Sequence, residues 1–386
     1  MRKQTLILLL ALTACTAKAP LSLQVVRSEM ARCPEASYID GQEGKLKWNY
    51  TTGLELKAML DSAPEETLSY VDAWYDAIID STGTIFKYKQ SNYSLDHICP
   101  GRTLFSLYDI TGKEKYRAAM DTLYNQLLNQ PRTPEGGFWH KAVYPQQMWL
   151  DGLYMAEPFY AEYTRRFVTD SLERAANFED IVLQFQLVFD ETLDPETGLL
   201  RHAWDSSREM FWSDEETGQS AHAWGRAMGW YAMALVDVIP LMPSGENQDA
   251  LVRLLNQIFQ SIPLYADATT GMWFQVLDRP YEEGNYLEAT ASAMFTYAML
   301  KSTRLGILEG FTRDDAKARY EELLSQFVTT GEDGLVNLND CCEVAGLGGK
   351  QNRSGDYDYY INEPVRANDP KGIGPLIWAA LEYEKL

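Results

Sequence analysis

The sequence predicts an all-α protein, a six-hairpin toroid or (α/α)6 barrel. From about residue 45 onward the 386-residue chain shows helical periodicity and almost none of the alternation typical of strands. A weak repeat also recurs in the linking segments, where a glycine is followed by bulky residues at Gly137, Gly198, Gly271 and Gly334, which lie 61, 73 and 63 residues apart. A period of about 60 residues holds two helices with their loops, and the chain has room for six such hairpins.

Twelve helices are expected, and their start and stop signals are visible in the sequence. Asp170 precedes the helix that runs on from Leu172, and Pro131 and Pro240 each follow the end of a helix. No Pro/Gly/Ser-rich linker divides residues 45–386, which we therefore expect to form a single catalytic domain; an open α-solenoid would have shorter and more regular repeats. The expected helices lie near 24–34, 48–62, 68–81, 101–110, 114–129, 147–166, 170–190, 221–240, 247–262, 287–303, 313–328 and 371–385.

The amino terminus has the pattern of an export signal. Arg2 and Lys3 precede an apolar stretch over residues 6–12, which is too short to span a bilayer. Leu12-Thr13-Ala14-Cys15 resembles a bacterial lipobox, which implies cleavage before Cys15 and lipid on its sulfur. Residues 1–14 are thus predicted to be a lipoprotein signal peptide and residues 15–44 a lipidated tether with the first helix. The protein is expected to be exported and to touch the membrane only through this anchor; a plain secretory signal is the alternative.

The composition excludes some classes of function. With 34 Lys+Arg against 55 Asp+Glu, the formal net charge is −21, and no basic run follows the first residues, which argues against a nucleic-acid partner. The aromatic fraction of 12%, with 10 Trp and 23 Tyr, suits an aromatic-lined cleft.

No Cys or His spacing fits a metal site, and no cofactor is predicted. Cys33, Cys99, Cys341 and Cys342 are interpreted mainly as small buried hydrophobes, with a disulfide of Cys33 or Cys99 left open.

Two carboxylates stand out as candidates for acid–base chemistry. Asp151 lies among apolar and aromatic neighbours such as Trp149, an environment expected to raise its pKa toward what a general acid needs. Asp96 precedes His97 just ahead of a helix and is the natural second carboxylate. Either aspartate can instead be a helix cap.

A third group is carried by one helix. His222, Arg226 and Trp230 share one face at i, i+4 and i+8, beside a stripe formed by Gly225 and Gly229. Arg226 offers a fork for a carboxylate and Trp230 a platform for a sugar ring, and the glycines imply close approach of a helix or ligand. A salt-bridged helix with a buried tryptophan is the alternative. All four histidines, which include His140 and His202, fall in loops or at helix starts.

Together these segments resemble the unsaturated rhamnogalacturonyl hydrolases, glycoside hydrolase family 105, which are related to the unsaturated glucuronyl hydrolases. The resemblance covers roughly residues 45–386 and rests on four motifs in order, namely residues 149–155, 225–230, 285–294 and 368–375. It implies an (α/α)6 fold without a metal. It also implies removal of a 4,5-unsaturated uronic acid from the non-reducing end of lyase-generated oligosaccharides, by hydration rather than by direct displacement at C1.

The resemblance also assigns roles to residues. Asp151 matches the general acid/base and Asp96 the second acid, whose negative charge would keep Asp151 protonated. Substrate-contacting positions are matched or suggested at Trp48, Tyr50, His140, Trp149, His202, Arg226 and Trp230, and the neighbouring His97 and His222 are carried with them.

Other functions stay open at this point. An unsaturated glucuronyl hydrolase or an inverting glycosidase would use the same toroid, the latter with Asp96 and Asp151 as its carboxylate pair. A sugar epimerase would depend on paired histidines. A glycan-binding surface lipoprotein without activity belongs to a different class, and binding without turnover would distinguish it. The sequence does not show the linked sugar, the membrane leaflet or the oligomeric state.

Overall fold

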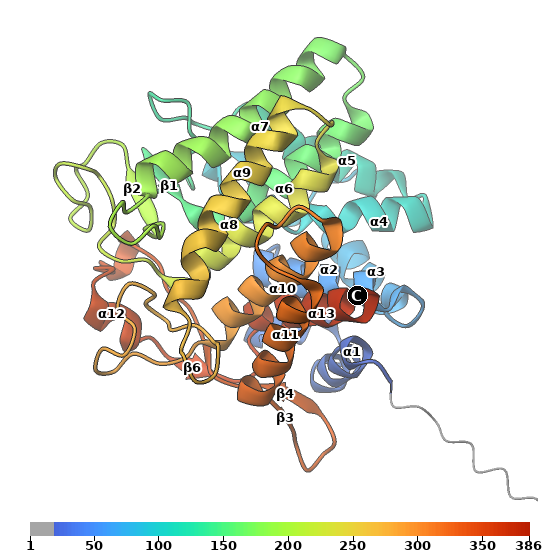
Figure 1. Ribbon diagram of the computed structural model, residues 1–386. Helices are drawn as coiled ribbons and strands as arrows, with labels where there is room; N and C mark the ends of the chain where they lie inside the picture. The colour runs from blue at the N-terminus through green and yellow to red at the C-terminus, as the bar shows by residue number, and fades with distance from the viewer. Residues whose placement is uncertain (1–18) are drawn as a thin grey trace, which may run out of the picture.

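The predicted (α/α)6 toroid is confirmed. The computed structural model describes residues 19–386, and within them twelve long helices form two concentric rings (Figure 1). The inner helices are α2 (Tyr50–Ser62), α4 (Gly101–Thr111), α6 (Leu150–Phe167), α8 (Gly225–Val238), α10 (Ala289–Leu305) and α13 (Pro370–Lys385). The outer helices are α1 (Leu21–Arg32), α3 (Pro64–Ile78), α5 (Glu114–Leu128), α7 (Ser171–Thr192), α9 (Glu246–Ser261) and α11 (Arg313–Phe327). Outer and inner helices alternate along the chain, and α13 closes the inner ring against α10 and α2.

The segment predicted as a tether contributes to this ring from residue 21 onward. Helix α1 packs against α13, and Ser22 donates to the carboxylate of Glu384 through its amide (3.1 Å) and its hydroxyl (2.8 Å). The predicted signal peptide, residues 1–14, and the predicted lipidation site, Cys15, lie outside the described residues. Between residues 19 and 386, no helix is both long and apolar enough to cross a bilayer.

Short strands were not predicted. They form three antiparallel pairs: β1 (Gln147–Trp149) with β2 (Ala203–Asp205), β3 (Val328–Thr330) with β4 (Val336–Leu338), and β5 (Cys341–Cys342) with β6 (Val365–Arg366). The one-turn helix α12 (Tyr357–Ile361) was also missed. Strand β1 explains why α6 begins at Leu150 rather than near 147, since the apolar residues Met148 and Trp149 suit a buried strand as well as a helix face.

The repeated glycine turns join the end of an outer helix to the next inner helix. In two of them, Gly198 and Gly271 donate their amides to the carbonyls of Asp194 and Asp267, both at 2.8 Å. Both glycines have a positive φ, of 70° and 68°, which explains the choice of residue. Bridges such as that between Leu193 and Leu200 tie each turn closed, so the weak sequence repeat marks a repeated architecture.

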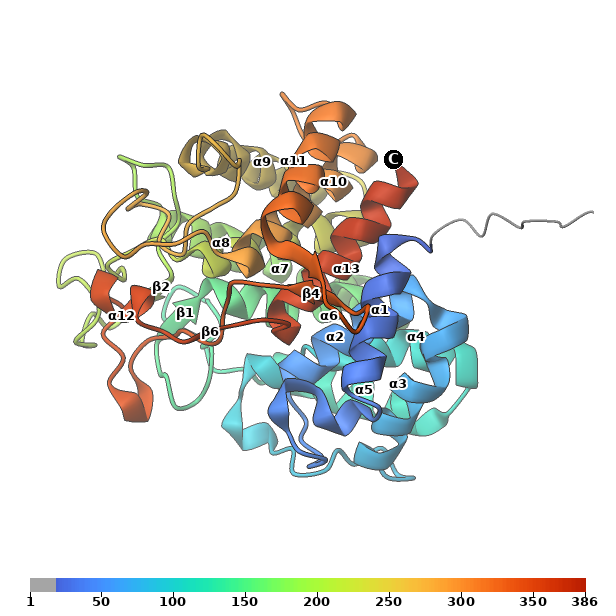
Figure 2. The ribbon, with the colours of Figure 1, turned by 90° about the horizontal axis from the view of Figure 1, so that it is seen from below.

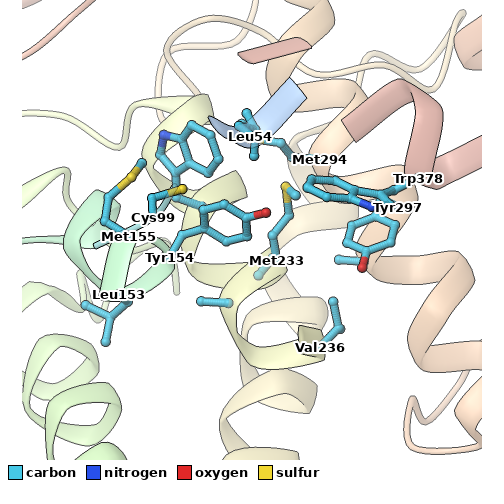
Figure 3. Close-up of a cluster of buried hydrophobic side chains, with 14 of the residues drawn as sticks. Leu54, Cys99, Leu153, Tyr154, Met155, Met233, Val236, Met294, Tyr297 and Trp378 are labelled. Carbon is cyan, nitrogen blue, oxygen red and sulfur yellow. The ribbon is translucent and has the colours of Figure 1, made fainter. Parts of the chain in front are cut away.

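The core lies along the axis of the inner ring. Figure 3 shows Leu54, Tyr154, Met233, Met294 and Trp378, which come from α2, α6, α8, α10 and α13 and lie together in its interior. All five are buried. The cysteines follow the prediction: Cys99, Cys341 and Cys342 are buried and Cys33 is half-buried, and all four are free thiols.

The inner helices present their amino ends at one side of the toroid. Figures 1 and 2 both show β1, β2, β6 and α12 gathered there, and β1 runs directly into α6. The first amides of α6, α8 and α10 donate to loop carbonyls of His202, Gln275 and Asp340. Residues far apart in the sequence therefore meet at this end, where helix dipoles favour anions.

Gly225 and Gly229 allow α8 to approach α10 closely, as their spacing predicted. A Cβ at Gly225 would lie 2.9 Å from the carbonyl oxygen of Phe274 and 3.1 Å from the Cβ of Ala291. At Gly229 it would lie 2.7 Å from Sδ and 2.9 Å from Cβ of Met294. Of the two explanations offered by the sequence, helix packing is the one the structure shows.

We therefore expect Gly229→Ala to destabilise the protein by about 1–3 kcal/mol, because the added methyl forces α8 and α10 apart. Urea unfolding followed by circular dichroism measures the change. A double-mutant cycle with Met294→Ala is the control: that substitution removes the thioether that would lie 2.7 Å from the added methyl, so Gly229→Ala should cost less in the Met294→Ala background than in the wild-type protein. An unchanged unfolding midpoint for the single variant would show that the helix contact tolerates the methyl.

Candidate active site

Asp151 lies in the first turn of α6 and is one end of a chain of close polar contacts. Its Oδ2 is 3.3 Å from Nε2 of His202, a fully buried residue just before β2. The other ring nitrogen of His202, Nδ1, is 2.7 Å from the hydroxyl of Tyr360 on α12. The Asp151 side chain remains 16% exposed, so it is accessible to a substrate from the amino end of the ring.

Asp96 forms a second pair beside the first. It lies in the one-turn 3-10 helix Leu95–His97 that leads into α4. Its Oδ2 is 2.5 Å from Nζ of Lys141, and its Oδ1 is 3.5 Å from Nε2 of His140. The structure thus brings together two aspartate–histidine pairs, one of which also holds a lysine.

Trp149 separates the two histidines. Its ring stacks on His140 with centroids 4.7 Å apart, and it meets His202 edge-on at 5.3 Å. Tyr144 stacks on Trp149 at 5.0 Å. Because Trp149 is 4% exposed, it orients the histidines more than it offers a bare platform to a sugar.

The expected rise in the pKa of Asp151 is wrong for the free site. Burial raises this pKa, but the hydrogen bond and charge of His202, with the charges of His140 and Arg226, lower it further than burial raises it. The sequence analysis considered the apolar neighbours along the chain, whereas the fold supplies polar partners from distant segments.

Asp96 is not a free negative charge. Burial raises its pKa, but Lys141 and His140 outweigh burial and lower it. The pKa of His140 is lowered to about 4 by burial and by Lys141, against the opposing effect of Asp96. At neutral pH the second pair is therefore a carboxylate held by a lysine next to a neutral imidazole.

Arg226 provides a buried cation near Asp151. Its Nη1 donates to the carbonyl of Cys342 at 2.6 Å, and its guanidinium lies 4.6 Å from the ring centroid of Trp224. Its Nε is buried without a hydrogen-bond partner. An unpaired donor on a buried guanidinium marks a place where a carboxylate ligand is favourable.

Two tryptophans differ from their predicted role as sugar platforms. Trp230 is 1% exposed and stacks on Tyr154 at 4.8 Å, so its ring supports the site from behind. Trp48 is 5% exposed, stacks on Trp74 and donates through Nε1 to the carbonyl of His97. The half-buried Tyr50, whose ring meets Trp230 edge-on at 6.4 Å, lines the cavity beside Asp96.

The remaining histidines lie at different places. His97 lines a cavity next to Asp96, and its Nδ1 is buried without a partner. His222 is held by Asp278, whose Oδ2 lies 2.9 Å from Nδ1, and its carbonyl accepts from the amide of His202. His222 therefore supports the loop of His202, and its side chain belongs to an ion-pair network rather than to the Asp151 chain.

Sequence reasoning missed Lys141 and Tyr360. Lys141 directly follows His140, and this adjacency to a candidate residue was the only available signal. Tyr360 is 158 residues from His202, and no local pattern connects them. Among residues 19–386, no group of three or more His, Cys, Asp or Glu side chains is arranged to hold a metal ion.

A toroid with acid–base pairs, a buried arginine and aromatic rings at one end has the architecture of a carbohydrate-active hydrolase. The chain belongs to Glycosyl Hydrolase Family 88, whose family model matches residues 21–386. It is therefore a glycosidase, and the predicted resemblance to family 105 is confirmed by the following relatives.

A glycoside hydrolase from family 105 of C. acetobutylicum ATCC 824 is 42% identical, with a TM-score of 0.89 over 95% of this chain and 100% of that one. The unsaturated rhamnogalacturonyl hydrolase YesR of Bacillus subtilis (strain 168) is 32% identical over 222 residues, which are 55% of this chain and 59% of YesR. The unsaturated glucuronyl hydrolase of Bacillus sp. GL1 shares the fold, with 10% identity and a TM-score of 0.66 over 94% and 95% of the two chains.

The pKa of His140 should shift when a neighbouring charged side chain is replaced by a neutral one. Lys141→Met is expected to raise the pKa of His140 above about 4, because a nearby positive charge is removed. Asp96→Asn is expected to lower it, because a negative charge is removed. Histidine-selective NMR titration measures both shifts. Lys45→Met, which removes an exposed lysine, is the control, and shifts of the same sign in the two test variants would contradict the arrangement.

Proposed function

We propose that this glycosidase removes a 4,5-unsaturated uronic acid from the non-reducing end of oligosaccharides produced by polysaccharide lyases. The observation that carries the proposal is an acid–base group and an unsatisfied cation in one site: Asp151, paired with His202, lies within the electrostatic influence of Arg226. Similarity to YesR favours unsaturated galacturonyl-rhamnose from rhamnogalacturonan as the substrate. We further propose that the protein is exported as a lipoprotein anchored through Cys15.

The reaction is a hydration of the C4=C5 enol ether. Asp151 donates its proton to C4, and the positive charge that develops at C5 is met by water. Asp151 then accepts a proton from that water, which leaves a hydroxyl on C5 and regenerates the acid. The resulting hemiketal opens and releases the rest of the oligosaccharide. The same carboxyl group therefore acts first as acid and then as base.

In the free site the pKa of Asp151 is lowered, whereas the reaction needs its protonated form. We expect substrate binding to raise this pKa. The Arg226 guanidinium lowers the pKa of Asp151 in the free site. A uronate carboxylate bound to Arg226 offsets that charge, and the sugar displaces water from around Asp151. Both effects raise the pKa of Asp151 and favour its acid form.

His202 and Tyr360 allow Asp151 to hold either proton state. When Asp151 is ionised, Nε2–H of His202 donates to the carboxylate and Tyr360 donates to Nδ1. When Asp151 is protonated, it donates to Nε2, and Nδ1–H donates to the oxygen of Tyr360. Burial raises the pKa of Tyr360 well above its usual value, so the phenol is present as a hydroxyl in both arrangements.

Asp151→Asn is expected to lose about 100-fold or more in kcat while it still folds, because the amide cannot deliver or accept the proton. The assay follows the ultraviolet absorbance of the enol ether in unsaturated galacturonyl-rhamnose, with release of rhamnose as a second readout. Asp190→Asn, at an exposed aspartate of α7, is the matched control.

If the wild-type enzyme leaves the absorbance of this disaccharide unchanged, unsaturated glucuronyl disaccharides are assayed next. Activity on only one of the two substrates distinguishes a galacturonyl from a glucuronyl hydrolase. Stable absorbance on both substrates, or full activity of Asp151→Asn, would overturn the proposal. Cleavage of a saturated oligosaccharide would instead identify an inverting glycosidase.

Tyr360→Phe is expected to move the basic limb of the kcat–pH profile to lower pH. Without the phenol, Nδ1 loses its donor when Asp151 is ionised and Nδ1–H loses its acceptor when Asp151 is protonated; an orphaned buried N–H is the costlier of the two, so the acid form of Asp151 is destabilised more. Tyr357→Phe is the control, since Tyr357 lies on the same helix but donates to the carbonyl of Glu283. A uniform loss of kcat with an unshifted profile would assign Tyr360 a purely structural role.

A further inference from the structure

Gln275, in the segment between α9 and α10, is a fully buried polar residue next to the active site. Its backbone is fixed on both sides. Its amide donates to the carbonyl of Tyr286 at 2.9 Å, and its carbonyl accepts from the amide of Gly225 at 2.9 Å, where α8 begins. The side chain of Gln275 therefore starts from a fixed point beside the helix that carries Arg226.

The side-chain amide of Gln275 has a partner at each end. Its Oε1 accepts from Nε1 of Trp224 at 3.0 Å, and its Nε2 lies 3.2 Å from the carbonyl oxygen of Tyr360 and 3.1 Å from Sγ of Cys342. The orientation of this amide is fixed, because an indole nitrogen can only donate and a backbone carbonyl can only accept. One side chain therefore joins the start of α8, strand β5 and helix α12.

Two of these partners hold the cation of the site. The guanidinium of Arg226 lies 4.6 Å from the ring centroid of Trp224, and its Nη1 donates to the carbonyl of Cys342 at 2.6 Å. The peptide of Cys342 is also held from its other side, since its amide donates to Oε1 of Glu288 at 2.8 Å. Glu288 belongs to the motif over residues 285–294, so this motif contributes to the position of Arg226 as well.

The third partner belongs to the acid–base chain. Gln275 contacts the backbone carbonyl of Tyr360, whose hydroxyl is 2.7 Å from Nδ1 of His202. The ring of Tyr360 also stacks on Trp224, with centroids 6.0 Å apart, and the centroid of the His202 ring lies 4.7 Å from that of Trp224. Loss of the Gln275 amide is therefore expected to disturb both the cation and the partner of the acid–base group.

We propose that Gln275 is a positioning residue, which fixes Arg226 for the substrate carboxylate and fixes Tyr360 for the acid–base chain. This inference rests on the proposed function and deepens it. Because Gln275 is fully buried, it acts through these two residues rather than by touching the substrate. Its effect on binding should then disappear once Arg226 is replaced, and its effect on proton transfer should disappear once Tyr360 is replaced.

The test measures KM and the kcat–pH profile of Gln275→Met on the unsaturated disaccharide that the wild-type enzyme hydrates. Methionine keeps the length of the side chain and removes its hydrogen bonds. KM should rise about threefold to tenfold, as expected for the loss of one hydrogen bond, and the basic limb should move to lower pH, as for Tyr360→Phe. Gln275→Met should cause no further rise of KM in the Arg226→Ala background and no further shift of the limb in the Tyr360→Phe background.

Gln184→Met is the matched control. Gln184 on α7 is 1% exposed and, like Gln275, uses both ends of its amide, but its partners are Phe138, Gly136 and Asp180. Urea unfolding should show that both glutamine variants lose stability. Only Gln275→Met should change KM and the pH profile.

Effects of Gln275→Met that persist undiminished in both backgrounds would assign Gln275 a purely structural role, and unchanged KM with an unshifted profile would also overturn the proposal. If Gln275→Met does not fold, Gln275→Asn replaces it with the same expected results, since the amide is then one methylene too short to keep both of its contacts.

A measurement that needs no turnover separates this proposal from the proposed function. The ¹⁵N NMR signals of the His202 ring report its hydrogen bonds. Gln275→Met should change these signals in the wild-type background and leave them unchanged in the Tyr360→Phe background. If the wild-type enzyme hydrates neither unsaturated disaccharide, the proposed function fails, and unaltered His202 signals in Gln275→Met would reject the positioning of Tyr360 independently.

Discussion

Closure of the inner helical ring is the constraint on which the site depends. Helix α13 packs between α10 and α2, and this contact joins the end of the chain to its beginning. In the closed ring the segment around α12 lies close enough for Tyr360 to reach His202, and the carbonyl of Cys342 accepts from Arg226. The close approach of α8 and α10 at Gly225 and Gly229 also positions the site, because α8 carries Arg226. The chemistry is thus assembled from residues that no local segment brings together.

The two carboxylates of the site are kept ionised by different partners. Asp96 is bound to Lys141, a permanent charge, whereas Asp151 faces an imidazole that can either donate or accept a hydrogen bond. A carboxylate fixed by a lysine suits a binding or electrostatic role, and one fixed by an imidazole can change its proton state without a buried group losing its partner. This difference supports the proposed acid–base role of Asp151 more directly than its apolar sequence neighbours do.

The sequence predicted the ring, its twelve long helices and the repeated turns because each depends on local periodicity and turn residues. It also singled out Asp96, Asp151, His140, His202 and Arg226, partly through the family resemblance, and the structure brings these residues together. It misjudged the pKa of Asp151 and the exposure of Trp48 and Trp230, which depend on tertiary partners. Lys141 and Tyr360 gave no comparable signal, because the pairing of Lys141 with Asp96 and of Tyr360 with His202 spans loops far apart in the chain.

The overall charge gives the buried cation Arg226 its importance. A protein of formal net charge −21 repels an acidic oligosaccharide at long range, and salt screens that repulsion over about 10 Å at 0.1 M. Inside the site, Arg226 lies in a buried and less screened setting, where its unpaired Nε favours one carboxylate strongly. An acidic surface therefore makes the proposed binding of an anionic substrate depend on short-range contact with Arg226 rather than on long-range attraction.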